Sequence, residues 1–163
     1  MKKKMILSSF VATIFMVILM TVCHAAGSIP KGDVALGGIT IGASEDYVRG
    51  VYGEPSDISY KTTGAFGKMK IFQYGESFFV TFNNNGKVIE IMSDENNGIK
   101  TPPGFTVGMP LSDVRDYYGP VGHEGKSKDG GRFIRYSPEW GLYISYGCDE
   151  DGIISNITVY ISP

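Results

Sequence analysis

Few side chains in this sequence could carry out catalysis. Of two histidines and two cysteines, only His123 and Cys148 lie outside the first 25 residues. A Ser-His-Asp arrangement needs a positioned histidine, and a cysteine nucleophile needs a neighbouring base. No local motif links these two residues, so the sequence favours a solvent-exposed loop histidine and a buried, apolar cysteine. We therefore predict no catalytic residues and a protein that is not an enzyme. A hydrolase and an intermolecular Cys148 disulfide are the remaining alternatives.

A run of carboxylates at Asp149–Asp151, followed by Gly152, could attract a cation. Calcium prefers roughly six to eight oxygen ligands, which so short a run cannot supply alone. The corresponding run in the first half of the sequence is Asn83–Asn85 followed by Gly86, and it carries no charge. The two runs share turn-forming residues and not ligand charge. They therefore predict hairpin turns, and we expect neither a metal nor a cofactor.

The N-terminus has the three parts of a secretory signal peptide. Lys2–Lys4 form a positive start, an apolar run extends from Met5 to Val22, and the small residues Cys23 and Ala25 precede a cut after Ala25. Residues 1–25 are thus predicted to be a signal peptide. Two alternatives stay open. One is an uncleaved membrane anchor, and the other is a lipid on Cys23, for which Val22 is an unfavourable preceding residue because it is not small.

Charge and hydropathy restrict the partners of the mature protein. The predicted cut removes three of the 15 basic residues and none of the 17 acidic ones, which leaves a net charge of −5. An acidic protein without a Lys/Arg run lacks the electrostatic footprint of a nucleic-acid or anionic-lipid binder. No second apolar stretch approaches the length of a membrane span. We expect a protein partner, no nucleic acid and no membrane span in the mature protein, which would be located in the periplasm or outside the cell.

A spacing of 66 positions relates the two halves of the sequence. The matched pairs are Ile39 and Phe105, Gly42 and Gly108, Val48 and Val114, Tyr52 and Tyr118, Gly53 and Gly119, and Gly86 and Gly152. The order of elements, the glycines and the apolar alternation all recur, which predicts an internal duplication.

Each half predicts one short helix followed by antiparallel strands. Ser44 is a suitable N-cap for the first helix, and Gly53 with Pro55 ends it. Alternating apolar residues predict strands at 57–62, 68–74, 78–82, 87–92, 132–136, 142–146 and 153–161. The predicted fold class is α+β, with two tandem helix-plus-antiparallel-meander repeats and both helices on one face of the sheet. The repeats span residues 36–95 and 103–163, and a connector spans residues 96–102.

A short motif precedes the strands in each half. Its two copies are Ile41-Gly42-Ala43 through Val48 to Tyr52-Gly53-Glu54-Pro55, and Val107-Gly108-Met109 through Val114 to Tyr118-Gly119-Pro120. This pattern resembles the tandem repeat of beta-lactamase inhibitory protein-like folds, and it is similar to the single module of the small outer-membrane-assembly lipoproteins. The first resemblance implies an exported, non-enzymatic binding protein. The second implies a structural or assembly component of the bacterial cell envelope, with a lipid anchor at Cys23. The sequence lacks the inhibitor's pair of cysteines in each copy, and no contact residues can be carried over.

Aromatic side chains give the most specific functional hypothesis. The alternation of Phe78–Phe82 puts three apolar side chains on the core face, and so puts Phe79 on the opposite one. The rings expected on the face without helices are those of Phe79, Tyr143 and Tyr160. Further candidates, whose strand alternation is ambiguous, are Tyr74, Tyr136 and Trp140.

Tyrosine and tryptophan are favoured at binding hot spots. We therefore predict an exported, non-enzymatic protein-binding module that recognises its partner through this aromatic face, with an inhibitor-like protein as one possibility. The other interpretation is that the rings form ordinary cross-strand pairs that only stiffen the sheet.

The predicted signal peptide can be tested on the mature protein. Mass spectrometry of the protein recovered from the producing cell should find Ala26 as the first residue and no lipid, because the small residues before Ala26 fit signal-peptide cleavage. A lipid on Cys23 would instead support the envelope component.

Overall fold

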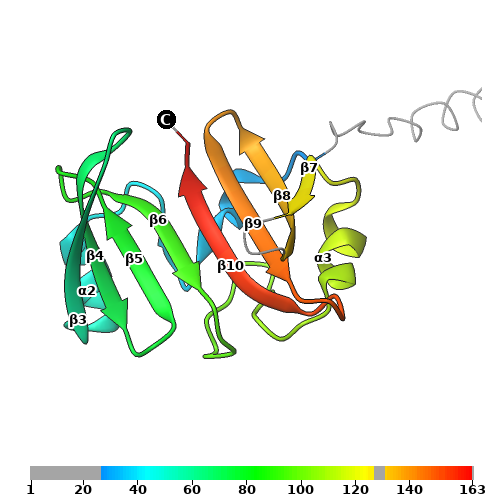
Figure 1. The fold of residues 1–163 in the computed structure, drawn as a ribbon, viewed down its shortest axis with the longest axis horizontal. Helices are drawn as coiled ribbons and strands as arrows, with labels where there is room; N and C mark the ends of the chain where they lie inside the picture. The colour runs from blue at the N-terminus through cyan, green and yellow to red at the C-terminus, as the bar shows by residue number, and fades with distance from the viewer. Residues whose placement is uncertain (1–26, 127–130, 163) are drawn as a thin grey trace, which may run out of the picture.

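The computed structural model describes residues 27–126 and 131–162, and its main feature is one antiparallel sheet of eight strands in the order β3-β4-β5-β6-β10-β9-β8-β7 (Figure 1). The first four strands are β3 (Asp57–Thr63), β4 (Gly67–Tyr74), β5 (Phe78–Phe82) and β6 (Val88–Ser93). The last four are β7 (His123–Lys126), β8 (Arg132–Glu139), β9 (Leu142–Cys148) and β10 (Ile154–Ile161). Two helices, α2 (Glu45–Tyr52) and α3 (Leu111–Tyr118), precede the first and the second set.

The prediction of an α+β fold built from two tandem helix-plus-meander repeats is wrong. The protein is mostly β, with 47% of residues in strands and 14% in helices. Its eight main strands form a single sheet, in which β6 pairs with β10 over Glu90–Ser93. A second sheet of two short strands, β1 (Ala35–Leu36) and β2 (Ile39–Thr40), adds further β structure. The predicted division at residues 96–102 stays a prediction.

The local elements follow the sequence closely. The Ser44 Oγ accepts a hydrogen bond from the backbone N–H of Tyr47 at 3.2 Å, which confirms Ser44 as the N-cap of α2. Gly53 ends this helix with φ of 78°, a conformation that favours glycine. Each helix has eight residues, so neither would be stable alone in water, and both need the sheet beneath them.

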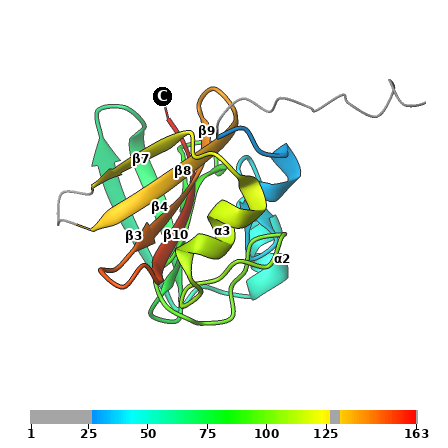
Figure 2. The same cartoon turned by 90° about the vertical axis from the view of Figure 1, so that its right-hand side faces the viewer.

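All the covering elements lie on the same face of the sheet (Figure 2). Helix α2 buries Val48, and α3 buries Leu111 and Val114. The β1–β2 hairpin contacts β10 and β6, and its Leu36 and Ile39 side chains are fully buried. The hairpin therefore completes the apolar layer over the central strands. We call this the covered face, and the opposite side of the sheet the open face.

Two predictions concern membrane-related segments of the sequence. The predicted signal peptide, residues 1–25, lies outside the described residues. Among the residues that are described, no helix is both long enough and apolar enough to cross a membrane.

Two neighbouring glycines in the β1–β2 turn provide a test of how the hairpin is seated. Gly37 and Gly38 both have positive φ, but a Cβ on Gly37 would meet the Tyr52 hydroxyl at 2.2 Å, whereas a Cβ on Gly38 would meet nothing. We expect Gly38→Ala to lower the free energy of unfolding by about 1 kcal/mol, the cost of the left-handed backbone. Gly37→Ala should cost about 2–3 kcal/mol or more, because it also displaces a ring whose hydroxyl donates to the Gly37 carbonyl. Urea unfolding measures both, and equal losses would contradict the close contact with Tyr52.

Candidate functional site

A row of paired residues crosses the open face at the centre of the sheet. From β5 to β7 its members are Phe79, Met92, Thr158, Ser145, Arg135 and His123, each the direct cross-strand partner of the next. Side chains of directly paired residues lie on the same face of a sheet. The row therefore joins the predicted residue Phe79 to the strands that carry the remaining open-face aromatics.

Tyr143, Tyr160 and Arg135 form a compact cluster on this face. Tyr143 and Tyr160 are cross-strand partners, and their ring centroids are 5.5 Å apart at an interplanar angle of 32°. The Arg135 guanidinium lies over the Tyr143 ring, with Cζ 4.9 Å from its centroid, and its Nη1 donates to the Tyr160 hydroxyl at 2.9 Å. All three side chains are half-buried. The cluster is a rigid aromatic surface with a fixed positive charge.

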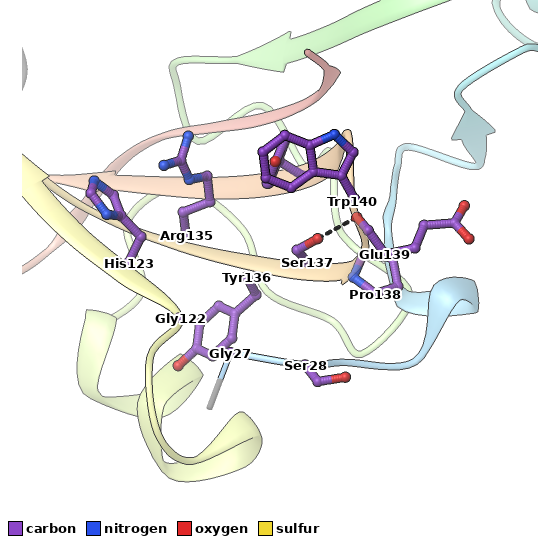
Figure 3. A pocket seen from close by; sticks show the side chains of 11 residues that line it. Gly27, Ser28, Gly122, His123, Arg135, Tyr136, Ser137, Pro138, Glu139 and Trp140 are labelled. Carbon is purple, nitrogen blue, oxygen red and sulfur yellow. Dashed lines mark hydrogen bonds between the residues drawn. The ribbon is translucent and has the colours of Figure 1, made fainter. Parts of the chain in front are cut away.

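A cavity of about 410 Å³ opens beside this cluster (Figure 3). Its walls come from β8, the β8–β9 turn, the start of β7 and the first described residues of the protein. The side chains that line it include those of His123, Arg135, Trp140 and Tyr143. Gly27 and Ser28 line the cavity because they run beside the part of β8 that lies beyond the start of β7. The Ser137 N–H donates there to the Gly27 carbonyl at 2.9 Å.

Trp140 is placed at the rim of this cavity by a two-residue turn, Trp140–Gly141, between β8 and β9. The single hydroxyl proton of Ser137 is shared within this hairpin between the carbonyls of Glu139 at 2.5 Å and Leu142 at 2.8 Å, and this contact stabilises the turn. Trp140 is 95% exposed, the highest value among the large hydrophobic residues that are exposed in the described structure. A flat apolar ring is thus presented to solvent on a well-anchored turn.

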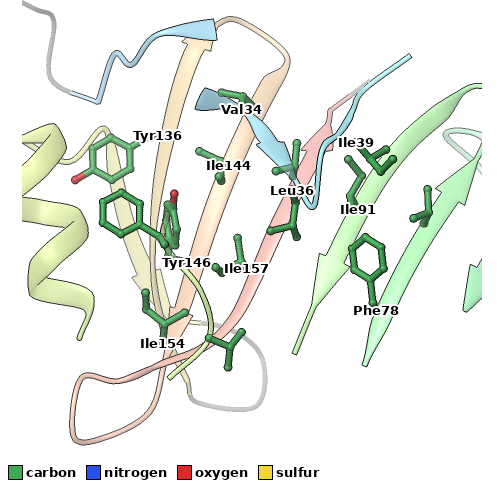
Figure 4. Close-up of a cluster of buried hydrophobic side chains, with 14 of the residues drawn as sticks. Val34, Leu36, Ile39, Phe78, Ile91, Tyr136, Ile144, Tyr146, Ile154 and Ile157 are labelled. Atoms are coloured by element: carbon green, nitrogen blue, oxygen red, sulfur yellow. The ribbon is translucent and has the colours of Figure 1, made fainter. Parts of the chain in front are cut away.

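Two of the predicted site residues lie on the covered face instead. Tyr136 is only 1% exposed and sits in the buried cluster beside α3 (Figure 4), where its hydroxyl donates to the Gly119 carbonyl at 3.1 Å. Tyr74 is half-buried, stacks against Tyr52 with centroids 5.3 Å apart, and donates to the Gly53 carbonyl at 3.2 Å.

The placement of Tyr74 and Tyr136 on the open face is therefore wrong. Burial raises the pKa of both hydroxyls above the ordinary tyrosine value, with Arg49 opposing the shift at Tyr74 and Arg115 at Tyr136. Their physical role is to tie the sheet to the helix ends, because each hydroxyl satisfies a carbonyl just beyond a helix C-terminus.

The other predicted site residues lie on or beside the open face, but they do not form one group. Phe79, Tyr143 and Tyr160 lie on the open face and Trp140 lies at its end. Phe79 is separated from Tyr143 by the strands β6 and β10, so it extends the face without lining the cavity.

The chemically reactive residues are set apart from one another. His123 begins β7 and is not in a loop as predicted, and it faces Arg135 on the open face. Cys148 is 3% exposed in the core, on the covered face. Asp149–Gly152 forms a turn in which Asp149 Oδ1 accepts from the Ile153 N–H at 2.8 Å, which confirms the turn prediction. Within residues 27–126 and 131–162, no group of three or more His, Cys, Asp and Glu side chains could hold a metal ion.

Arg135 was not singled out from the sequence, although the signal was present. Ile134 and Tyr136 alternate with Arg135 in β8, and Ile134 is fully buried. An isoleucine flanked by arginine and phenylalanine could have fixed which side of β8 faces the core. Arg135 then falls on the same side as Tyr143.

Comparisons with known proteins bear on the fold. No protein-family model matches the sequence, and no curated protein is similar to it in sequence. An extracellular protein containing a SCP domain from Bacillus anthracis str. Ames is similar in structure, with a TM-score of 0.53 and 17% identity over 75% of this chain and 44% of that one. A DUF4309 family protein (YjgB) from Bacillus subtilis gives a TM-score of 0.51 and 14% identity, covering 83% of this chain and 88% of that one.

A cysteine-rich secretory protein from Staphylococcus aureus subsp. aureus Mu50 gives a TM-score of 0.54 and 8% identity, covering 75% of this chain and 44% of that one. The protein thus spans less than half the length of the Bacillus anthracis and Staphylococcus aureus proteins. At such low identities these similarities show a shared fold and nothing further.

Two tyrosines on adjacent strands test the assignment of the faces. Tyr136→Ala should lower the free energy of unfolding by about 3–5 kcal/mol, because it empties a fully buried ring site. Tyr143→Ala should cost only about 1 kcal/mol, since it removes a half-buried ring from the open face. Chemical denaturation of both variants measures the difference. Equal losses would show that the two rings do not lie in different environments.

Proposed function

We propose that this protein is an exported, non-enzymatic module that binds a protein partner through the open face of its sheet. The observation that carries the proposal is the cluster of Arg135, Tyr143 and Tyr160 beside the exposed ring of Trp140. In the part of the protein that the structure describes, both helices and the β1–β2 hairpin lie on the opposite side.

The composition of this surface supports binding of a protein. Tryptophan, tyrosine and arginine are the residue types most enriched at interface hot spots. The ring pair and the guanidinium are already held together before any partner arrives, so binding would immobilise few additional side chains. Met92 and Phe79 extend the apolar area along the central row. An enzyme to be inhibited is one class of partner that the resemblance to beta-lactamase inhibitory proteins suggests.

Export is supported by two independent lines. The N-terminal 25 residues have the pattern of a signal peptide. Two of the proteins with a similar fold are called extracellular or secretory. Only one cysteine would remain after the predicted cleavage, so the exported domain would depend on its apolar core for stability.

The proposal is tested by capture of partners from the producing cell. We expect Tyr143→Ala combined with Trp140→Ala to leave the protein folded and to lower the amount of captured partner at least about tenfold, because truncating hot-spot rings typically costs that much affinity. The immobilised mature protein is incubated with the envelope and culture fractions, and bound proteins are quantified by mass spectrometry.

Tyr60→Ala is the matched control. Tyr60 is 59% exposed, but it faces the covered side of edge strand β3, beside Lys70 of β4. This variant should capture the same partner as the unmodified protein. Capture that is unchanged in the double variant would contradict binding through the open face.

A further inference from the structure

The cavity beside Arg135 contains a positive charge that has no carboxylate partner within the described residues. The basic residues of the four ion pairs in the described part of the protein are Lys31, Arg49, Lys70 and Arg115. Arg135 takes part in none of them. A half-buried guanidinium gains more from a carboxylate than from a hydroxyl, because the attraction between opposite charges adds to the hydrogen bonds and a carboxylate can accept two of them in parallel.

The carboxylates nearest to the cavity are engaged elsewhere or turned away from it. Glu139 lines the cavity but pairs with Lys31 at 2.6 Å. Glu124 follows His123 in β7, and the alternation of the strand sends it to the covered side, where Arg115 binds it at 2.8 Å. Glu90 is opposite Tyr160 on the open face and makes no ion pair among the described residues. None of these carboxylates, and no other among the described residues, forms an ion pair with Arg135.

The guanidinium is also held in one orientation. Its Nη1 donates to the Tyr160 hydroxyl, and its plane is supported by the Tyr143 ring. Within the described residues, no hydrogen bond is made by the opposite edge, which carries Nε and Nη2. That edge presents two parallel N–H donors, the geometry that matches the two oxygens of a carboxylate.

We propose that this cavity binds a carboxylate that is attached to a flat apolar group, with the carboxylate on the free edge of Arg135 and the apolar group against Trp140. The volume of about 410 Å³ lies within the range of small-ligand sites. A single guanidinium with one edge already occupied suits a planar carboxylate better than a phosphate, which usually recruits several cations or a helix N-terminus. The inference deepens the proposed function, on which it rests, and names the chemistry that a partner's peptide would present there.

The protein has its own reporter for this site. Trp140 is its only tryptophan, so its fluorescence reports on the cavity alone. We expect N-acetylphenylalanine to change this fluorescence with a millimolar Kd, and its uncharged amide to bind at least about tenfold more weakly, because the amide loses the charged hydrogen bonds. Arg135→Gln should remove this preference, whereas Lys61→Gln, which alters a cation of the same face at the far edge strand β3, should keep it.

Two further probes distinguish the source of the carboxylate. N-acetylphenylalanine carries a free α-carboxylate, whereas the dipeptide N-acetyl-aspartyl-phenylalanine amide carries only a side-chain carboxylate. A preference for the first assigns the cavity to the C-termini of polypeptides, and a preference for the second assigns it to acidic side chains; either result supports the inference. Inorganic phosphate should compete poorly with both.

Failure of this inference can be separated from failure of the proposed function. Equal binding of acid and amide, or a preference that survives in Arg135→Gln, overturns the carboxylate site, even if the Tyr143/Trp140 double variant still loses its captured partner. A heteronuclear NMR spectrum of Arg135→Gln is recorded to check that the variant is folded. It also locates the probe, and shifts away from His123, Arg135 and Trp140 would likewise overturn the site.

Discussion

The antiparallel pairing of β6 with β10 is the constraint on which the rest of the structure depends. In this register Ile91 lies opposite Val159 and Glu90 lies opposite Tyr160. The first pair is fully buried, and the second is on the open face. Because side chains alternate along a strand, a slip of one residue would reverse the two faces of β10. The core and the candidate site are therefore fixed by the same hydrogen bonds.

The covered face explains why the open face can remain uncovered. Small elements cover the sheet: two helices of eight residues each and a hairpin with two residues in each strand. Leu36 and Ile39 of the hairpin are fully buried over the centre, between the two helices. One apolar layer on one side is enough to bury the large side chains that the central strands direct toward the covered face. The opposite face is thereby available for polar and aromatic side chains whose packing does not determine the fold.

Residues of the site could be assigned to a face from the sequence where apolar and polar residues alternate regularly. The assignment was wrong where the residue is of a type that occurs on both faces of a sheet. Phe79 could be assigned because Phe78, Val80 and Phe82 surround it with a clear apolar pattern. Tyr136 was misassigned because its ring is large and apolar while its hydroxyl is polar, so its residue type alone fits either face. Its position two residues after Ile134 is the signal that places it on the core side.

A tertiary contact holds Tyr136 on the covered face. Its hydroxyl donates to the carbonyl of Gly119 at the end of α3, a contact with a different element that the alternation of β8 does not reveal. The pairing of β1 with β2 was not predicted for a different reason: strands of two residues are too short to display a period. The single, mostly β sheet likewise depends on the β6–β10 pairing, which joins segments more than 60 residues apart and has no local signal.

Tyrosine thus has two physical roles in this protein, and the difference between them supports the assignment of the site. On the covered face, Tyr74 and Tyr136 donate to backbone carbonyls just beyond the helices, so their hydroxyls are used for structure. On the open face, the Tyr160 hydroxyl accepts from Arg135 and the Tyr143 ring supports the same guanidinium. Neither of these open-face contacts joins the sheet to another layer. Their physical effect is to fix the direction of one positive charge beside a cavity, which is the arrangement that recognition of a negatively charged group requires.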